Sequence, residues 1–365
     1  MKVKEVIKIL EELAPAQYQE SYDNAGLITG SGQEEVQNVL VTLDCTEEIV
    51  EEAIQKGCNL IVAHHPIVFK GLKRLNGKDY VERTVIKAIK NDICIFAIHT
   101  NLDNMIHGVN KKIADLIGLE NVKILSPIKN NQLFLSTYVP VADIDKVQNA
   151  LAVAGAGKIG NYDGCNFQIE GKGSFTPNDN ANPAIGFKGK PESVKEIKIE
   201  VQFPSHLKSK VLSALQAAHP YEEVVYQLQT LESTSKEIGS GMYGTLPSPI
   251  SEMELLKKLK VVFKAGVIKH TPLRNKMVTK VALCGGAGSF LLRNAIGVNA
   301  DFFVSGDFKY HEFFDAEGKI VIADIGHYES EQFTSDLLVD HLSDNFPSIS
   351  FIKTEINTNP VNCFV

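Results

Sequence analysis

Histidine and carboxylate residues follow several predicted strands of this sequence, at the points where those strands end. His64 and His65 end one apolar segment, Asp103 lies shortly after another, and His327 and Glu331 follow a third. Because the carboxyl ends of parallel strands meet at one edge of a sheet, we expect these side chains to lie close together. Three imidazoles and two carboxylates make up the donor set of a dinuclear hydrolytic metal site.

The adjacent pair His64 and His65 is the sharpest local feature. In a regular strand the two side chains would point to opposite faces. At a strand end the chain can turn, so that both rings face one cavity and each serves one of two neighbouring metal ions. Pro66 favours an extended conformation of His65 and would help to hold that turn. The alternative is a pair of hydrogen-bonded loop residues that bind no metal.

The other three candidates also have two interpretations each. His327 and Glu331 are four residues apart at the start of a predicted helix, so they share a face and could approach one metal ion. Asp103, in the segment HTNLDN, could bridge two cations. The alternatives are a solvent-exposed helical pair and an Asx turn or helix cap.

Further polar residues could support the site or face a substrate. Lys309 and His311, in SGDFKYHEF, could meet an anion or exchange a proton, unless they only begin an exposed helix. The glycine-rich segment CGGAGS could bind a phosphate with its amides, although a tight turn explains it better. The remaining candidates are strand-end residues and one turn: Asp44, His99, Asp307, Asp324, and Asp23 with Asn24 in SYDNAGL.

The elements that must position these residues alternate between helix and strand. Apolar spacing predicts a helix over 3–13, a strand over 36–44, and a helix over 46–57 with Thr46 as its N-cap. The same alternation continues to about 125 and returns after 250. It predicts an α/β core of mostly parallel sheet flanked by helices, formed by residues 1–125 plus 241–365.

Residues 126–240 have a different pattern. Segments of period two, bounded by Gly and Pro, alternate with two helical segments near 142–154 and 206–218. We therefore expect an inserted α+β domain. Two of its segments stand out, AGAGKIGNYDGC and HPYEEV. In the second, His219 and the pair Glu222 and Glu223 could bind a metal or mark a small-molecule surface. A turn and a strand entry are the favoured interpretation of both.

Composition excludes several classes of protein. The chain has 365 residues, of which 44% are hydrophobic and 22% charged, as in an ordinary globular protein. A net charge of −7 argues against nucleic-acid binding as the default, although a local basic patch would leave it open. No apolar segment is long enough to span a membrane. Six cysteines without a CxxC pair predict reduced thiols and a cytoplasmic location.

Seven segments in this order resemble the NIF3-like family, also called the GTP cyclohydrolase 1 type 2 family: SYDNAGL, AHHP, HTNLDN, GSGMYGTL, CGGAGS, SGDFKYH and GHYESE. They span nearly the whole predicted core. The inserted segments GAGKIGNYDGC and HPYEEVVY resemble the long bacterial form of the family. That form carries an extra ferredoxin-type domain similar to PII and CutA proteins.

The resemblance implies a NIF3-like core that holds two divalent metal ions per chain, of zinc, iron or manganese. Matched residue by residue, the ligands would be His64, His65, Asp103, His327 and Glu331. The resemblance also implies a homohexameric ring whose metal sites face an internal cavity. The family name implies a GTP cyclohydrolase activity, that is, hydrolysis of a nucleotide.

Two classes of function therefore stay open. One is a metal-dependent hydrolase acting on a nucleotide-like substrate, in which His99, His311 or Glu331 could assist proton transfer. The other is a non-catalytic regulatory or sensor protein, in which the metal centre is structural and the insert binds a ligand or partner. A nucleic-acid-binding ring is a third interpretation, which the negative net charge opposes.

Overall fold

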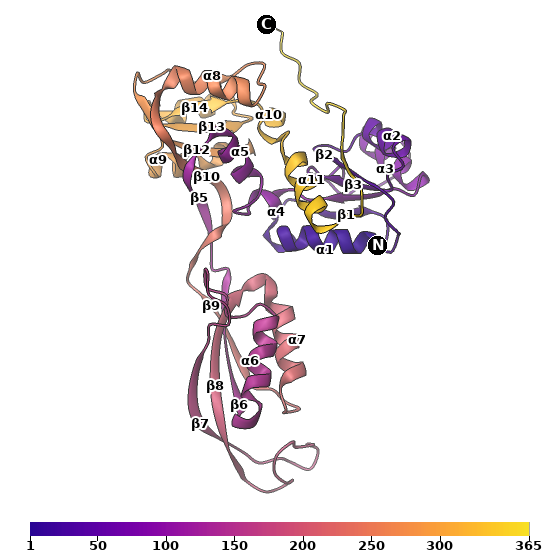
Figure 1. Cartoon of the computed structure of the whole chain (residues 1–365), viewed down its shortest axis with the longest axis vertical. Coiled ribbons are helices and arrows are strands. Elements are labelled where there is room, and N and C mark those ends of the chain that lie inside the picture. The colour runs from indigo at the N-terminus through magenta and orange to yellow at the C-terminus, as the bar shows by residue number, and fades with distance from the viewer. Residues whose placement is uncertain (365) are drawn as a thin grey trace. The chain divides into compact units, whose positions relative to one another are not determined.

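The computed structural model describes residues 1–364 and forms two compact units (Figure 1). The core unit consists of Met1–Pro127 and Lys236–Val365. The insert unit consists of Ile128–Ser235. Each unit has a separate hydrophobic interior, so each is described by itself.

The first sheet of the core unit has the order β1-β4-β3-β2-β15. Its strands are β1 (Gly26–Thr29), β2 (Val39–Thr42), β3 (Leu60–Ala63), β4 (Cys94–Ala97) and β15 (Phe351–Lys353). Four of them run parallel, and β1 pairs antiparallel with β4. Every residue of β2, β3 and β4 is buried, as expected for parallel strands that are covered on both faces.

The second sheet has the order β11-β14-β13-β12-β10-β5. Its strands are β5 (Glu120–Lys129), β10 (Thr234–Ser251), β11 (Lys269–His270), β12 (Met277–Ala287), β13 (Phe302–Gly306) and β14 (Val321–Asp324). The middle strands β12, β13 and β14 run parallel, whereas β10 is antiparallel to β12. The predicted α/β core with parallel strands is confirmed. Its strands are divided between two sheets, because β12 pairs with the returning strand β10 and not with the first sheet.

Helices cover both sheets. They are α1 (Val3–Leu13), α2 (Glu47–Gln55), α3 (Tyr80–Lys90), α4 (Thr100–Asp103), α5 (Val109–Ile117), α8 (Glu252–Val262), α9 (Leu292–Gly297), α10 (His327–Glu331) and α11 (Thr334–Asn345), with 3-10 turns η1 (Ala16–Tyr18), η4 (Ser289–Leu291) and η5 (Tyr310–Ala316). The predicted helix over 3–13 is confirmed, and it buries Val3, Val6 and Leu10. Thr46 caps α2 by accepting a hydrogen bond from the Ile49 amide, as predicted. None of the helices formed by residues 1–364 has the length and apolar character needed to cross a membrane.

The insert unit has the ferredoxin-type topology. Its elements are β6 (Gln132–Pro140), η2 (Val141–Asp143), α6 (Ile144–Val153), β7 (Phe167–Phe175), β8 (Glu192–Pro204), η3 (Ser205–Leu207), α7 (Lys208–Ala218) and β9 (Tyr226–Leu231). The strands form one antiparallel sheet of order β7-β8-β6-β9, which is the β-α-β-β-α-β arrangement. The predicted inserted α+β domain is therefore confirmed. Its core lies between one sheet face and α6 and α7, around Phe203, Val211 and Leu215.

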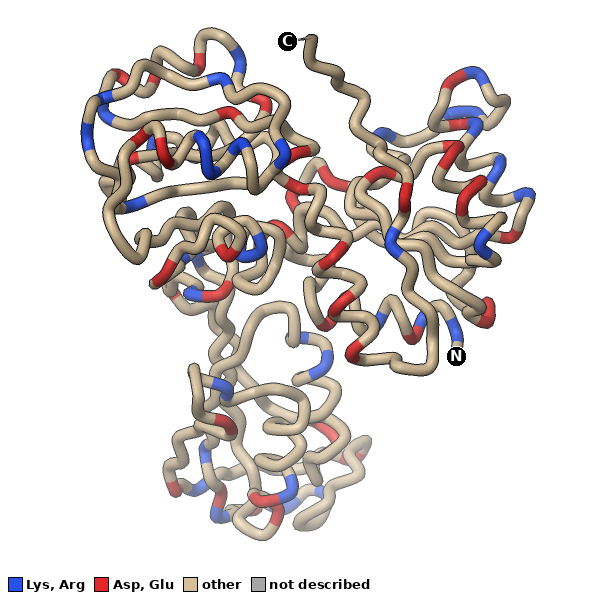
Figure 2. Tube along the Cα trace, turned by 45° about the horizontal axis from the view of Figure 1, so that its top comes forward, with Lys and Arg blue, Asp and Glu red and all other residues tan. Residues whose placement is uncertain are grey.

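Charged residues of both signs are interspersed along the trace of each unit (Figure 2). Helix α8, for example, carries Glu254 near its start and Lys257 and Lys260 further along, and all three are exposed. Such mixing is typical of solvated helical surfaces, on which charges of opposite sign partly offset one another.

A glycine in the core unit allows the turn before α5 to pass close to the backbone of α4. A Cβ atom on Gly108 would lie 1.8 Å from the carbonyl oxygen of Leu102. We expect Gly108→Ala to lower the free energy of unfolding by about 1–3 kcal/mol, because the backbone must shift to relieve the clash. Thermal and denaturant unfolding would measure this. Gly71→Ala is the matched control, since a Cβ there meets no atom within 4 Å; an equal loss in both variants would contradict the prediction.

Candidate metal centre

The carboxyl ends of the parallel strands in both sheets supply the candidate site. His64 and His65 follow β3, and Asp103 ends the short helix α4 after β4. His327 and Glu331 lie at opposite ends of α10, which follows β14. The structure therefore brings together all five residues that the sequence singles out, although they come from two sheets.

His64 presents an unpartnered nitrogen to this site. Its side chain is fully buried, and its Nδ1–H donates a hydrogen bond of 2.8 Å to the Ile98 carbonyl oxygen. The Nε2 atom lies 3.6 Å from Oδ1 of Asp103, and neither atom has a hydrogen-bond partner among the described residues. Burial lowers the pKa of His64 to about 3, so the ring is neutral at physiological pH. A neutral imidazole beside an unpartnered carboxylate oxygen fits a metal ion between them.

His65 and His327 are oriented in the same way as each other. Nδ1 of His65 lies 2.7 Å from Oδ1 of Asp44, and Nδ1 of His327 lies 2.7 Å from Oδ2 of Asp307. Both Nε2 atoms point at Oε2 of Glu331, at 3.0 and 3.1 Å. An imidazole fixed through one nitrogen by a carboxylate, with its other nitrogen directed into the site, is the usual arrangement of a metal-ligating histidine.

The electrostatics follow from this packing. Burial alone would lower the pKa of both rings, but their carboxylate partners raise it to about 9 for His65 and about 11 for His327. Burial would raise the pKa of Glu331, yet the hydrogen bonds from these two rings hold it well below its usual value. The pKa of Asp103 is raised, because Asp103 is buried and faces the charge of Glu331.

Glu331 is shared by two of the three donor sets. One set consists of His65, His327 and Glu331, and another of His64, Asp103 and Glu331. The sequence interpretation gave the bridging position to Asp103, whereas the structure places Glu331 in both sets and Asp103 in one. A third set joins His64 and His65 to His99.

Local backbone features place Glu331 and its neighbours. A Cβ atom on Gly286 would lie 2.5 Å from Oε1 of Glu331, so glycine is required where β12 passes the carboxylate. The Gly286 amide donates a hydrogen bond to Oγ of Ser330 in α10. Asp307 directly follows β13 with φ of 56°, a left-handed conformation that Asp tolerates, and its carboxylate meets His327.

Further hydrogen bonds hold the residues next to the donors. Oγ1 of Thr358 donates a hydrogen bond of 2.6 Å to the Asp44 oxygen that does not bind His65. Nδ1 of His99 lies 2.8 Å from Oδ1 of Asp23. Burial would raise the pKa of Asp23, but hydrogen bonds from His99 and Thr100 lower it to about 2. The sequence allows two interpretations of SYDNAGL, a simple turn or a part of the site. In the structure this turn holds His99 at the site through Asp23.

A cavity of about 740 Å³ opens beside the donors. Its wall includes the rings of His65, His99 and His327, together with Phe69 and Tyr328. It is large enough for a ligand of nucleotide size, because small-molecule pockets measure roughly 300–1,000 Å³.

Two weaker sequence candidates do not contribute to this site. Lys309 and His311 are exposed at η5, outside the donor sets and outside the residues that line the cavity. Amides of CGGAGS are used internally: Gly285 donates to Asn110 and Gly288 donates to Ser305. These bonds explain the segment as a packed strand end, and they leave those two amides unavailable to a phosphate.

The sequence identifies Asp44 and Asp307 as strand-end residues but assigns them no role. Their role follows from the strand order, since β2 neighbours β3 and β13 neighbours β14. A carboxylate that ends the strand next to a histidine-ending strand is placed to hold that histidine.

Comparison with known proteins defines the family. The chain belongs to the family Duf34/NIF3 (NGG1p interacting factor 3), whose model matches residues 1–360. A protein of Bacillus subtilis (strain 168) named GTP cyclohydrolase 1 type 2 homolog is 35% identical over 362 residues, covering 98% of this chain and 97% of that protein. A Listeria innocua protein of the same name is 36% identical over 363 residues, covering 98% and 97%. The resemblance seen in the sequence is confirmed.

Solved structures show the same fold over the full length. The structure of a Bacillus cereus protein related to NIF3 matches with a TM-score of 0.88 and 34% identity, covering 100% of this chain and 99% of that one. A Staphylococcus aureus protein matches with a TM-score of 0.79 and 29% identity, with the same coverage. The NIF3-like core with an inserted α+β domain is thus established.

Asp307 provides a test of the carboxylate–histidine pairs. We expect Asp307→Ala to weaken metal binding by about 10–100-fold, because His327 loses the partner that fixes its ring. Competition with a coloured chelator would measure the affinity at fixed pH. Asp315→Ala is the control, because Asp315 is an exposed carboxylate in η5 outside the donor sets. An unchanged affinity in Asp307→Ala would contradict the role given to this pair.

Metal affinity should also depend on pH. The raised pKa values of His65, about 9, and His327, about 11, mean that both rings hold a second proton at neutral pH without metal. A metal ion must displace these protons, so the apparent affinity should fall at least about tenfold per pH unit from pH 8 to pH 6. Titration calorimetry in buffers of different ionisation enthalpy would count the protons released. Release of no proton would contradict this account.

Proposed function

We propose that the core unit binds two divalent metal ions and hydrolyses a nucleotide-like substrate beside them. The observation that carries the proposal is the sharing of Glu331 between two donor sets. His65 and His327 complete one set, and His64 and Asp103 complete the other. Cations held by such sets supply a Lewis acid and a water nucleophile at neutral pH. Imidazole-rich donors favour zinc, iron or manganese over magnesium.

The cavity supports a planar, heterocyclic substrate. Phe69 and Tyr328 supply aromatic surface against which a base can pack, and the rings of His65, His99 and His327 line the same cavity. The relatives are named as GTP cyclohydrolase homologs, which gives a candidate reaction. In that reaction water adds to the carbon between the two imidazole nitrogens of guanine. One carbon–nitrogen bond of that ring then breaks, and the freed nitrogen gains a proton.

We assign proton transfer to His99. Its Nδ1 is fixed by Asp23, and its ring lies 5.3 Å from the rings of both His64 and His65, measured between centroids. Asp23 is held in turn by the backbone amide and the hydroxyl group of Thr100. The ring therefore keeps a constant orientation at the cavity wall, as a group that exchanges protons with a substrate must.

Metal content per chain tests the first half of the proposal. We expect elemental mass spectrometry to find about two transition-metal ions in the native protein, as in two-metal sites generally. His64→Ala and His327→Ala should each lose one equivalent, since each residue belongs to one of the two sets. Glu331→Gln should lose both equivalents. Glu329→Gln, in the same helix but outside the donor sets, should retain them. Two results would overturn the dinuclear centre. One is that Glu331→Gln retains its metal, and the other is that reconstituted native protein contains no metal.

Turnover tests the second half. Metal-loaded protein incubated with GTP should open the imidazole ring, seen as a change in ultraviolet absorption. Formate would be released only when a second water cleaves the remaining carbon–nitrogen bond of the resulting formamide. His99→Gln should lower kcat by about 10²–10⁴-fold, because the general acid–base group is lost. Metal content measured in the same variant separates this role from that of a ligand in the set of His64, His65 and His99. Full metal occupancy with no turnover of any nucleotide would instead favour the non-catalytic sensor.

A further inference from the structure

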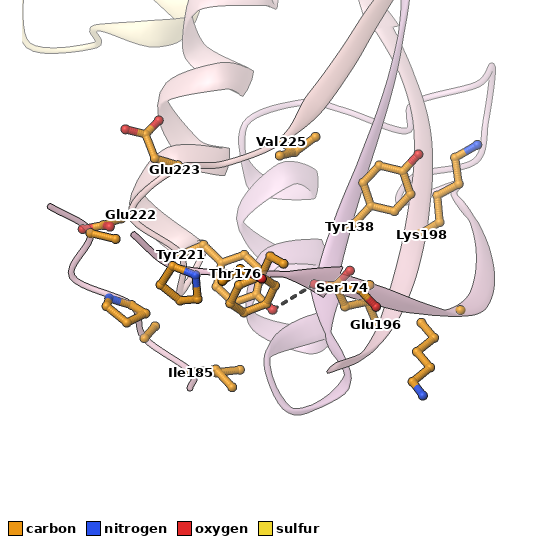
Figure 3. Close-up of a pocket in the computed structure, with 18 of the residues that line it drawn as sticks. Tyr138, Ser174, Thr176, Ile185, Glu196, Lys198, Tyr221, Glu222, Glu223 and Val225 are labelled. Atoms are coloured by element: carbon orange, nitrogen blue, oxygen red, sulfur yellow. Dashed lines mark hydrogen bonds between the residues drawn. The ribbon is translucent and has the colours of Figure 1, made fainter. Parts of the chain in front are cut away.

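The insert unit contains a cavity that the metal centre does not use. It measures about 790 Å³ and lies on the face of the sheet opposite α6 and α7 (Figure 3). Alternation along β8 sends Ile197 and Ile199 toward the helices, so Glu196 and Lys198 point to the open face. Residues of the segment 176–191 form a further wall.

Glycines on the edge strand make room in this cavity. Gly171 pairs with Glu196 across the β7–β8 ladder, and Gly173 follows two residues later on the same face. A Cβ atom on Gly173 would lie 2.2 Å from Oε2 of Glu196. The carboxylate can occupy its position only because this strand carries no side chain there.

Glu196 offers one oxygen to a ligand. The residue is 8% exposed, and its Oε1 accepts a hydrogen bond of 2.8 Å from the Tyr221 hydroxyl, drawn as a dashed line in Figure 3. Burial and the carboxylate of Glu196 raise the pKa of Tyr221. The phenol therefore stays protonated, and its O–H donates the hydrogen bond to Glu196. Oε2 accepts no hydrogen bond from the residues that the structure describes. Glu196 lines the cavity, so this oxygen is available to a hydrogen-bond donor on a ligand.

The turn HPYEEV explains why Tyr221 lies here. The Tyr221 amide donates to Nδ1 of His219, so Nε2 of that ring carries the hydrogen and donates to the Tyr138 carbonyl oxygen. Both nitrogens of His219 are thus engaged, which removes it as a metal ligand. Oε1 of Glu222 accepts from the amide of Asn182, which ties the 176–191 segment to the same turn.

Charge and aromatic surface define the ligand class. Among the lining residues outside the helix face of the sheet, the glutamates Glu196, Glu222 and Glu223 are set against one lysine, Lys198. The ammonium of Lys198 is paired with Glu200 at 2.6 Å. Three aromatic rings, of Tyr138, Phe175 and Tyr221, stand in the wall, and such rings attract cations to their faces.

We propose that this cavity binds a small organic cation with an aromatic or apolar body. The ligand's ammonium or amidinium group donates a hydrogen bond to Oε2 of Glu196, and its body packs against Phe175 and Tyr221. The insert unit is therefore a ligand-binding module whose specificity is independent of the metal centre.

Three compounds with one indole body test the proposal on the full-length, metal-loaded protein. Tryptamine carries an ammonium group, tryptophol is neutral, and indole-3-acetate is an anion. We expect titration calorimetry to show tryptamine binding at least about tenfold more tightly than tryptophol, since a hydrogen bond to a charged group contributes about 1.5–3 kcal/mol. Indole-3-acetate should not bind. Equal binding of tryptamine and tryptophol, preference for the anion, or no binding of tryptamine at millimolar concentration would overturn the proposal.

Variants locate the binding. Glu196→Gln should weaken tryptamine binding at least about tenfold while leaving the metal content unchanged. Glu232→Gln is the control, since Glu232 is an exposed carboxylate of the same unit outside the cavity wall. Should Glu196→Gln fail to fold, Gly173→Ala displaces the carboxylate by steric contact and should have the same effect. Undiminished tryptamine binding in the folded variant would overturn the assignment to Glu196.

Discussion

A single buried carboxylate, that of Glu331, governs the arrangement of the core unit's site. A charge taken out of water costs several kcal/mol unless other groups compensate it. Here the compensation comes from His65 and His327, within 3.0 and 3.1 Å, and each of those rings is supported by a carboxylate nearer the solvent. Negative and positive groups therefore alternate from Glu331 through the two histidines to the outer carboxylates. Removing any one of these groups leaves its neighbour without a partner.

The same constraint explains features of the backbone that have no catalytic role. Gly286 must lack a side chain so that β12 can pass the carboxylate, and Asp307 must adopt a left-handed conformation to reach His327. Thr358 completes the support of Asp44. Such local conformations carry a small free-energy cost, and the favourable interactions among the charged groups of the site offset it.

Much of this could be predicted from the sequence, for a definite reason. Parallel strands place their carboxyl ends at one edge, so strand-end positions grouped His64, His65, Asp103 and His327 with several other polar residues. Helical spacing added Glu331, and the family resemblance selected these five residues as the ligands. Which carboxylate lies between the donors could not be predicted, because that depends on how two separate sheets meet. The insert shows the same limit. Its period-two pattern predicts strands, but the pairing of β7 with β8 that sets Gly173 beside Glu196 is a long-range register that no local pattern encodes.

The spacing of the donors along the sequence determines when, during synthesis of the chain, the metal site can form. His65 and Glu331 are 266 residues apart, and the whole insert unit is made between them. The insert has its own hydrophobic core and can fold as soon as it leaves the ribosome. The metal site must wait until α10 has emerged. A bound metal ion would then join parts of the core unit made before and after the insert, so metal uptake would report that synthesis of both had succeeded.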